Sequence, residues 1–218
     1  MHLQFDVIWP SLPFIAEGIW VTLKFTALSL FCGLPLGVLL AFFKIAHLKP
    51  LQYFAHSYTA IFRGTPLLVQ LGIIFYATPQ LTGYSITAFE AGVLAFSLNS
   101  AAYSSEIIRS GIQSIDKGQW EASQVLGLSK VKTLWYIILP QAIRNILPAL
   151  VNEMVNLLKE SALVSTIGEA DLLQRAKVVA AEKFLYFEPL LLAACLYFLM
   201  VLIISACARK LEEKLSYA

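Results

Sequence analysis

Charged residues are scarce in this sequence. Asp, Glu, Lys and Arg make up 14% of the 218 residues and hydrophobic residues 58%, with a mean hydropathy of +0.71. Soluble domains carry about 25% charged residues, so the composition excludes an ordinary soluble domain and indicates an integral membrane protein. The net charge of +2 is too small to favour nucleic-acid binding. Lys and Arg are absent from the first twelve residues, so we expect no secretory signal and a retained N-terminus.

The residue patterns of ATP hydrolysis, metal binding and nucleophilic catalysis are also missing. No GxxxxGK[ST] phosphate-binding loop occurs, so ATP hydrolysis is not expected from this chain. Cys32, Cys195 and Cys207 lie in or beside apolar runs without metal-ligand spacing, and we expect them to be small core residues. The three histidines are scattered. The sequence therefore predicts no catalytic residues, no metal and no cofactor of its own.

Long apolar runs dominate what is present. About 20 residues of helix cross a bilayer, and five runs approach or exceed that length. The break Arg63-Gly64-Thr65-Pro66 interrupts the second run, and prolines lie in the fourth. We expect an all-α membrane protein with one transmembrane domain over residues 1–218. Its predicted parts are spans at about 14–43, 53–77, 86–108, 137–160 and 189–208, a polar loop at 109–136 and an amphipathic segment at 166–188.

The distribution of Lys and Arg predicts the orientation of these spans. With the N-terminus outside, the cytoplasmic segments hold ten Lys and Arg residues and the outer segments hold three. The positive-inside rule therefore favours an N-terminus outside and a C-terminus in the cytoplasm. The loop at 109–136 is then cytoplasmic, and 166–188 is extracytoplasmic.

The stretch 118–140 within and after that loop is polar enough to lie in water. The pattern predicts a helix from Gln119 to Leu126, a break at Gly127, and a second short helix that Ser129 can cap. Trp120, Leu126 and Leu128 would be exposed there unless another surface covered them. One interpretation is a docking site for a partner protein; the other is that the loop folds back on its own helices.

Polar side chains recur within the apolar runs, where ionisable groups are costly and tend to face a bundle interior or a pathway. Glu153, Asn156 and Glu160 follow one helical stripe of the fourth run, because residues seven apart share a face. Arg63 and Asn99, from other runs, could converge with the stripe. These five are the candidate substrate-binding residues. The alternative is a structural network in which Lys24, Arg63 or Lys159 neutralises the glutamates.

The stretch 118–140 and several further stretches resemble a known protein family. Glu121, Ala122, Gly127 and the pair Leu139-Pro140 fill the places of the coupling-loop signature of bacterial ATP-binding-cassette (ABC) importer permeases, with Ser123 in place of a second alanine. Further stretches resemble the polar amino acid permeases in particular. They are RGTPLLVQL at 63–71, AAYSSEIIRSGIQSI at 101–115, PQAIRNILPAL at 140–150 and LLKESALVSTIG at 157–168.

The resemblance implies a type I importer permease fold and a set of partners. Two permease chains, identical or homologous, would span the inner membrane; a dimer of separate ATPase subunits would bind ATP, and an extracytoplasmic binding protein would deliver the amino acid. On this reading Trp120, Glu121, Ala122, Gly127 and Leu128 are the ATPase-coupling candidates.

The negative charge of the stripe with Glu153 and Glu160 indicates which kind of amino acid is carried. Two glutamates favour a basic amino acid such as arginine, lysine, ornithine or histidine, with glutamine or another polar amino acid next, and Arg63 could hold the substrate carboxylate. The alternative function is a passive channel or a membrane anchor whose cytoplasmic loop recruits a partner.

Overall fold

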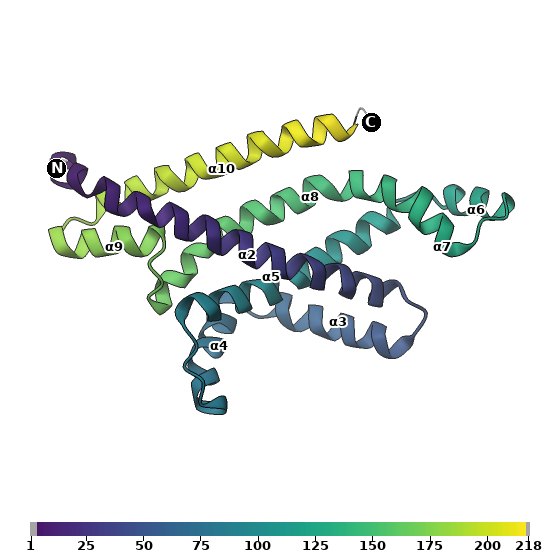
Figure 1. The fold of residues 1–218 in the computed structure, drawn as a ribbon, viewed down its shortest axis with the longest axis horizontal. Helices are drawn as coiled ribbons and strands as arrows, with labels where there is room; N and C mark the ends of the chain where they lie inside the picture. The colour runs from purple at the N-terminus through teal and green to yellow at the C-terminus, as the bar shows by residue number, and fades with distance from the viewer. Residues whose placement is uncertain (1–3, 217–218) are drawn as a thin grey trace.

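The computed structural model describes residues 4–216 and contains only helices in that range. Figure 1 shows long helices crossing at the centre, α9 beside the N-terminus at one end, and α6 and α7 at the other end. The helices are α1 (Phe5–Ile8), a 3-10 turn (Trp9–Ser11), α2 (Leu12–Ile45), α3 (Lys49–Gly64), α4 (Leu67–Thr82), α5 (Ala88–Gln113), α6 (Lys117–Val125), α7 (Lys130–Thr133), a π-helical turn (Leu134–Ile138), α8 (Leu139–Glu160), a 3-10 helix (Ser161–Ile167), α9 (Leu172–Lys183) and α10 (Phe187–Ser216).

Three stretches are long and apolar enough to cross a membrane: Phe5–Ile45, Lys130–Ile167 and Phe187–Lys210. The helices α3 and α4 add a fourth if together they form one broken span. The helix α5 covers the predicted third span and is long enough, but it carries several serines, Asn99 and Glu106 and is not among these apolar stretches. Because α5 lies inside the bundle, it need not be apolar all round. The count of five spans remains a prediction.

The second predicted span is not one straight helix. At Thr65 and Pro66 the axes of α3 and α4 turn by 99°. Both residues are extended, as expected for Pro66 and for the residue before it. The break therefore lies within the predicted 63–66 segment, while the helical structure extends beyond 53–77 in both directions.

Small residues let α2 and α5 pack closely. A Cβ atom added at Gly33 would lie 2.8 Å from the Ser97 carbonyl oxygen, and one added at Gly37 would lie 2.8 Å from the Ser104 Cβ atom. Such contacts between small residues are how membrane helices bring their backbones together. Toward the N-terminal half of α2, Phe25 packs edge-on against Phe96 with ring centroids 4.9 Å apart. The two helices thus form the centre of the bundle.

The end of the bundle that carries α9 is tied to α2 and α10. Asp171 caps α9 by accepting the Gln174 N–H at 2.8 Å, and it also accepts the Tyr197 hydroxyl of α10 at 3.1 Å. The Leu172 N–H donates to Thr22 of α2 at 3.3 Å. Burial raises the pKa of the Asp171 carboxyl above its usual value. The predicted outer segment is therefore a packed part of the fold.

The cysteines correct one expectation. Cys32, Cys195 and Cys207 are all exposed on the outside of α2 and α10, not buried in the core. Hydrophobic patterning could not separate the two cases, because a helix surface that faces lipid is as apolar as one that faces protein.

Candidate functional site

The loop between α5 and α8 forms the predicted helix, glycine turn and second helix. Asp116 starts α6 by accepting the Gly118 N–H at 2.6 Å. At the other end Gly127 has φ of 74°, its N–H bonds to the Gln124 carbonyl, and the Leu128 N–H bonds to the Ser123 carbonyl. This is a Schellman motif, in which glycine adopts the left-handed conformation at little cost. The predicted break at Gly127 is confirmed.

Ser129 begins α7, and its hydroxyl accepts the Lys132 N–H at 3.4 Å, as the sequence predicts. Ser123, which replaces an alanine of the coupling signature, is buried, and its hydroxyl donates to carbonyls of its own helix. The hydroxyl that the substitution introduces is therefore hydrogen-bonded.

Trp120 does not lie on the outer surface of the loop. It is half-buried and packs against an apolar cluster that includes Ile112 of α5, Ile115 just after α5, and Ile138 of the π-helical turn before α8. For Trp120 the second interpretation holds, because this side chain folds back on the chain's own helices. Trp120 anchors α6 to the bundle.

An apolar surface remains uncovered at the tip of the loop. Val125 is 87% exposed, Leu126 77% and Val131 66%, while Leu128 is half-buried. Glu121 and Ala122 are exposed on α6 beside them. Exposed aliphatic side chains with a polar rim are typical of a protein-interaction site. We call Glu121, Ala122, Val125, Leu126 and Val131 the loop surface.

An ion cluster that the sequence analysis missed joins α2 to α5 at the same end of the bundle as the loop. The Lys44 ammonium lies 2.6 Å from the Glu106 carboxylate and 2.7 Å from the Ser105 hydroxyl. Arg109 holds the other Glu106 oxygen from its Nε and Nη2 atoms at 3.0 and 2.7 Å. The Lys44 side chain is fully buried, so Glu106 is its essential counter-charge. Glu106 and Arg109 are three residues apart, about one helical turn, so their spacing in the sequence indicated this pair but not its contact with Lys44.

Asn99, a predicted substrate residue, lies at the bend between α3 and α4. Its Nδ2 atom donates to the Phe62 carbonyl at 3.1 Å and to Gln70 Oε1 at 3.2 Å. The Gln70 Nε2 atom in turn donates to Phe62, Thr65 and the Thr65 hydroxyl at 2.8–3.0 Å. These amides satisfy carbonyls that the end of α3 leaves open. The amide nitrogen of Asn99 is thus engaged within the chain.

The other four candidates lie at the end of α3 and on α8. Arg63, at the end of α3, is exposed and lies over the Tyr103 ring at 5.1 Å. Glu153 is half-buried on α8, where it is subject to the charges of both Arg63 and Glu160. Asn156 and Glu160 line a recess of about 370 Å³. We call Arg63, Glu153, Asn156 and Glu160 the polar face.

The structural-network alternative finds little support in the geometry. Among residues 4–216, neither Glu153 nor Glu160 forms a salt bridge with Lys24, Arg63 or Lys159. Lys24 lies instead over the Phe89 ring at 5.2 Å. The two carboxylates of the polar face thus have no salt-bridge partner among the described residues.

Residues 33–217 match the family of binding-protein-dependent transport system inner membrane components. The chain belongs to this family. A putative glutamine transport system permease protein of Rickettsia bellii (strain RML369-C) is 51% identical over 206 residues, 94% of each chain. An arginine transport system permease protein of Bacillus subtilis (strain 168) is 47% identical over 215 residues, 99% of this permease and 98% of the relative. The predicted amino acid permease family is thereby confirmed.

Solved structures agree with the fold of the permease. A chain in the crystal structure of an amino acid ABC transporter with histidines matches with a TM-score of 0.93 and 43% identity, covering 98% of the permease and 100% of that chain. An inward-facing methionine ABC transporter, MetNI, matches with a TM-score of 0.78 at 21% identity over 94% and 98%, which shows the fold alone. The permease is therefore a multi-pass inner-membrane subunit, not an enzyme, and ATP hydrolysis belongs to a separate subunit.

Proposed function

We propose that the chain forms the translocation path of an ATP-driven importer for a basic amino acid. The observation that carries the proposal is the polar face, where Glu153 lies near both Arg63 and Glu160 and neither glutamate forms a salt bridge. An amino acid with a cationic side chain needs acidic partners for its positive groups and a cation for its carboxylate. The polar face offers both, and Asn156 adds an amide.

The bend between α3 and α4 supports the same assignment. The helix α4 begins four residues after Arg63 with no side chain capping its first turn, so the N–H groups of Leu67 and Leu68 are open at its positive dipole end, while the Val69 N–H bonds to the Pro66 carbonyl. Transporters commonly direct such half-helix ends at the anionic groups of their substrates. The bend would thus help Arg63 hold the carboxylate, while Asn99 and Gln70 keep the end of α3 in place.

We further propose that the loop surface couples the permease to its ATPase subunits. Its exposed aliphatic residues suit a groove on a partner, with Glu121, Ala122, Gly127 and Leu128 shaping the contact and Trp120 anchoring it to α5 and α8. The assembly comprises a second permease chain, identical or homologous, an ATPase dimer that binds ATP and an extracytoplasmic binding protein. The termini lie outside and in the cytoplasm, respectively, as the Lys and Arg distribution predicts.

The substrate assignment is tested by uptake into vesicles that hold the assembled importer and ATP. Glu153→Gln should reduce uptake of arginine by at least about 10-fold, since a charge-assisted hydrogen bond is worth about 1.5–3 kcal/mol. Glutamine uptake should change less. The matched control is Glu182→Gln, at an exposed residue of α9. Equal effects on both amino acids, or no effect on either, would rule out the acidic face as the reason for basic specificity.

A further inference from the structure

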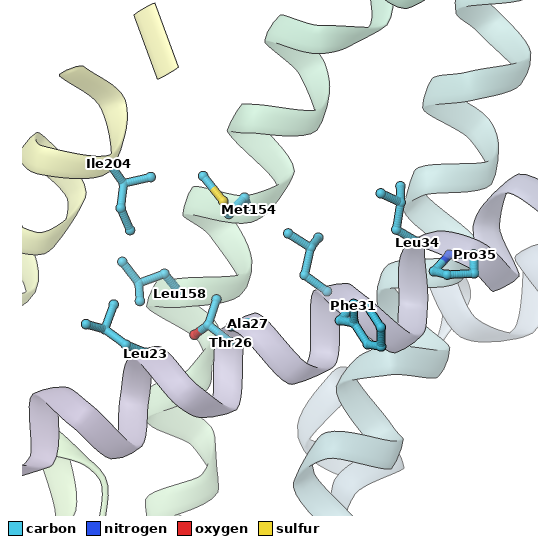
Figure 2. Close-up of a pocket in the computed structure, with 10 residues that line it drawn as sticks. Leu23, Thr26, Ala27, Phe31, Leu34, Pro35, Met154, Leu158 and Ile204 are labelled. Atoms are coloured by element: carbon cyan, nitrogen blue, oxygen red, sulfur yellow. The ribbon is translucent and has the colours of Figure 1, made fainter. Parts of the chain in front are cut away.

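An apolar groove runs between α2, α8 and α10, and its lining includes no residue of the polar face or of the loop surface. Figure 2 shows Leu23, Phe31 and Leu34 of α2 opposite Met154 of α8 and Ile204 of α10. This cavity measures about 610 Å³. A second hollow of about 410 Å³ continues it along α8 and α10 and shares Leu30, Leu34, Met154 and Ile204 with it.

The walls of the groove are suited to a hydrocarbon ligand and not to a polar one. Among the lining residues, Thr26 carries the one hydroxyl, and that hydroxyl already donates to the Thr22 carbonyl of its own helix at 2.8 Å. A polar ligand in the groove would lose its hydrogen bonds to water without replacing them. The groove therefore excludes the amino acid substrate and favours an acyl chain or an apolar helix.

One end of the groove is basic. Leu147, Cys207 and Ala208 line the second hollow there. On α8 Arg144 precedes Leu147 by three residues, and on α10 Arg209 and Lys210 directly follow Ala208; all three cations are exposed. Within the described part of the chain, none of them forms a salt bridge, although Glu212 and Glu213 follow on α10.

From this combination we propose that the groove is a binding site for an anionic phospholipid. Its acyl chains lie along Leu30, Leu34 and Met154, and its phosphate is held by Arg144, Arg209 and Lys210. Basic pockets between membrane helices bind anionic headgroups in this way. A second copy of this chain would match the charge poorly, because the apolar stretches 18–43 and 189–210 contain no Asp or Glu to meet these cations.

The binding test uses the permease assembled with its ATPase subunits in a zwitterionic detergent. Phosphatidylglycerol is titrated and the bound lipid is counted by native mass spectrometry. Arg144→Gln/Arg209→Gln should weaken binding by about 30-fold, at about fivefold for each basic residue near the headgroup. The control Lys49→Gln/Lys117→Gln removes two exposed charges distant in sequence from the groove and should leave binding unchanged. Equal binding by both double variants would overturn the proposal.

A second measurement locates the acyl chain and separates the possible occupants. Phosphatidylglycerol with a photoreactive group in its acyl chain should label the segments around Leu30 and Met154, and Ala27→Leu, which narrows the groove, should reduce that labelling. Soluble glycerol phosphate should not compete; effective competition would show that the cations bind a free phosphate and would overturn the lipid site. Absence of label in the assembled complex, with cross-linking of Cys207 to another copy, would show that a second chain fills the groove.

Discussion

In the ion cluster of Lys44, Glu106 and Arg109, we expect removal of the Glu106 charge to destabilise the fold more than removal of the Lys44 charge. The Lys44 side chain is fully buried, whereas that of Glu106 is 21% exposed. In Glu106→Gln the buried ammonium keeps only the Ser105 hydroxyl and a neutral amide, so we expect a loss of about 3–5 kcal/mol in the free energy of unfolding. In Lys44→Met the carboxylate keeps both bonds from Arg109, so the expected loss is about 1 kcal/mol.

The double variant sharpens this prediction. Replacing a buried ion pair by uncharged groups is often neutral, so Lys44→Met/Glu106→Gln should be more stable than Glu106→Gln by about 2 kcal/mol or more. Arg109→Gln, at a partly exposed residue, serves as the control and should cost less than about 1 kcal/mol. Denaturant titration of the purified permease in detergent, followed by circular dichroism, measures all four variants. Additive losses, or a larger loss for Lys44→Met than for Glu106→Gln, would refute the reasoning.

Three further predictions concern the loop and the α9 end. Glu121→Lys should release the ATPase or uncouple ATP hydrolysis from uptake while the helices stay folded; an assembled, fully active variant would contradict this. Gly127→Ala should destabilise the loop by about 1–2 kcal/mol because φ is 74°, which limited proteolysis of the loop would detect; unchanged cleavage would argue against it. Burial raises the pKa of Asp171, so this carboxyl binds a proton more tightly in the folded protein than in the unfolded chain. The free energy of unfolding should therefore fall as the pH rises above the pKa that Asp171 has in the unfolded chain. Asp171→Asn should flatten that dependence in thermal unfolding from pH 4 to 7; an unaltered slope would refute it.

Local chemistry made the loop predictable. Gly127, Ser129 and the Thr65-Pro66 break each act through their own backbone or side chain, so sequence alone predicts a turn, a cap and a bend there. The resemblance to ABC importer permeases also followed from residues close together in the loop, and four further short stretches between 63 and 168 narrowed it to the amino acid permeases. Such features depend on neighbours within a few positions.

Contacts between distant segments were less predictable. The partner of Lys44 lies 62 residues away, and the Asn99 amide bonds to Gln70 across 29 residues. The direction of Trp120 and the exposure of Cys207 depended on which apolar face meets protein and which meets lipid. Hydrophobic periodicity marks both faces alike, so the sequence could name polar candidates within the membrane but could not distinguish a ligand site from a helix-end bond.

The close packing of α2 on α5 at Gly33 and Gly37 affects how a movement of the loop would be transmitted to the bundle. Trp120 fastens α6 to the isoleucines of α5 and α8, and this close packing leaves α5 no room to slide past α2. A displacement of α6 would therefore move α2 and α5 together as one rigid unit. The 99° bend between α3 and α4 is bonded to α5 through Asn99, which donates to the Phe62 carbonyl and to Gln70, so a displacement of α5 would reach that bend directly.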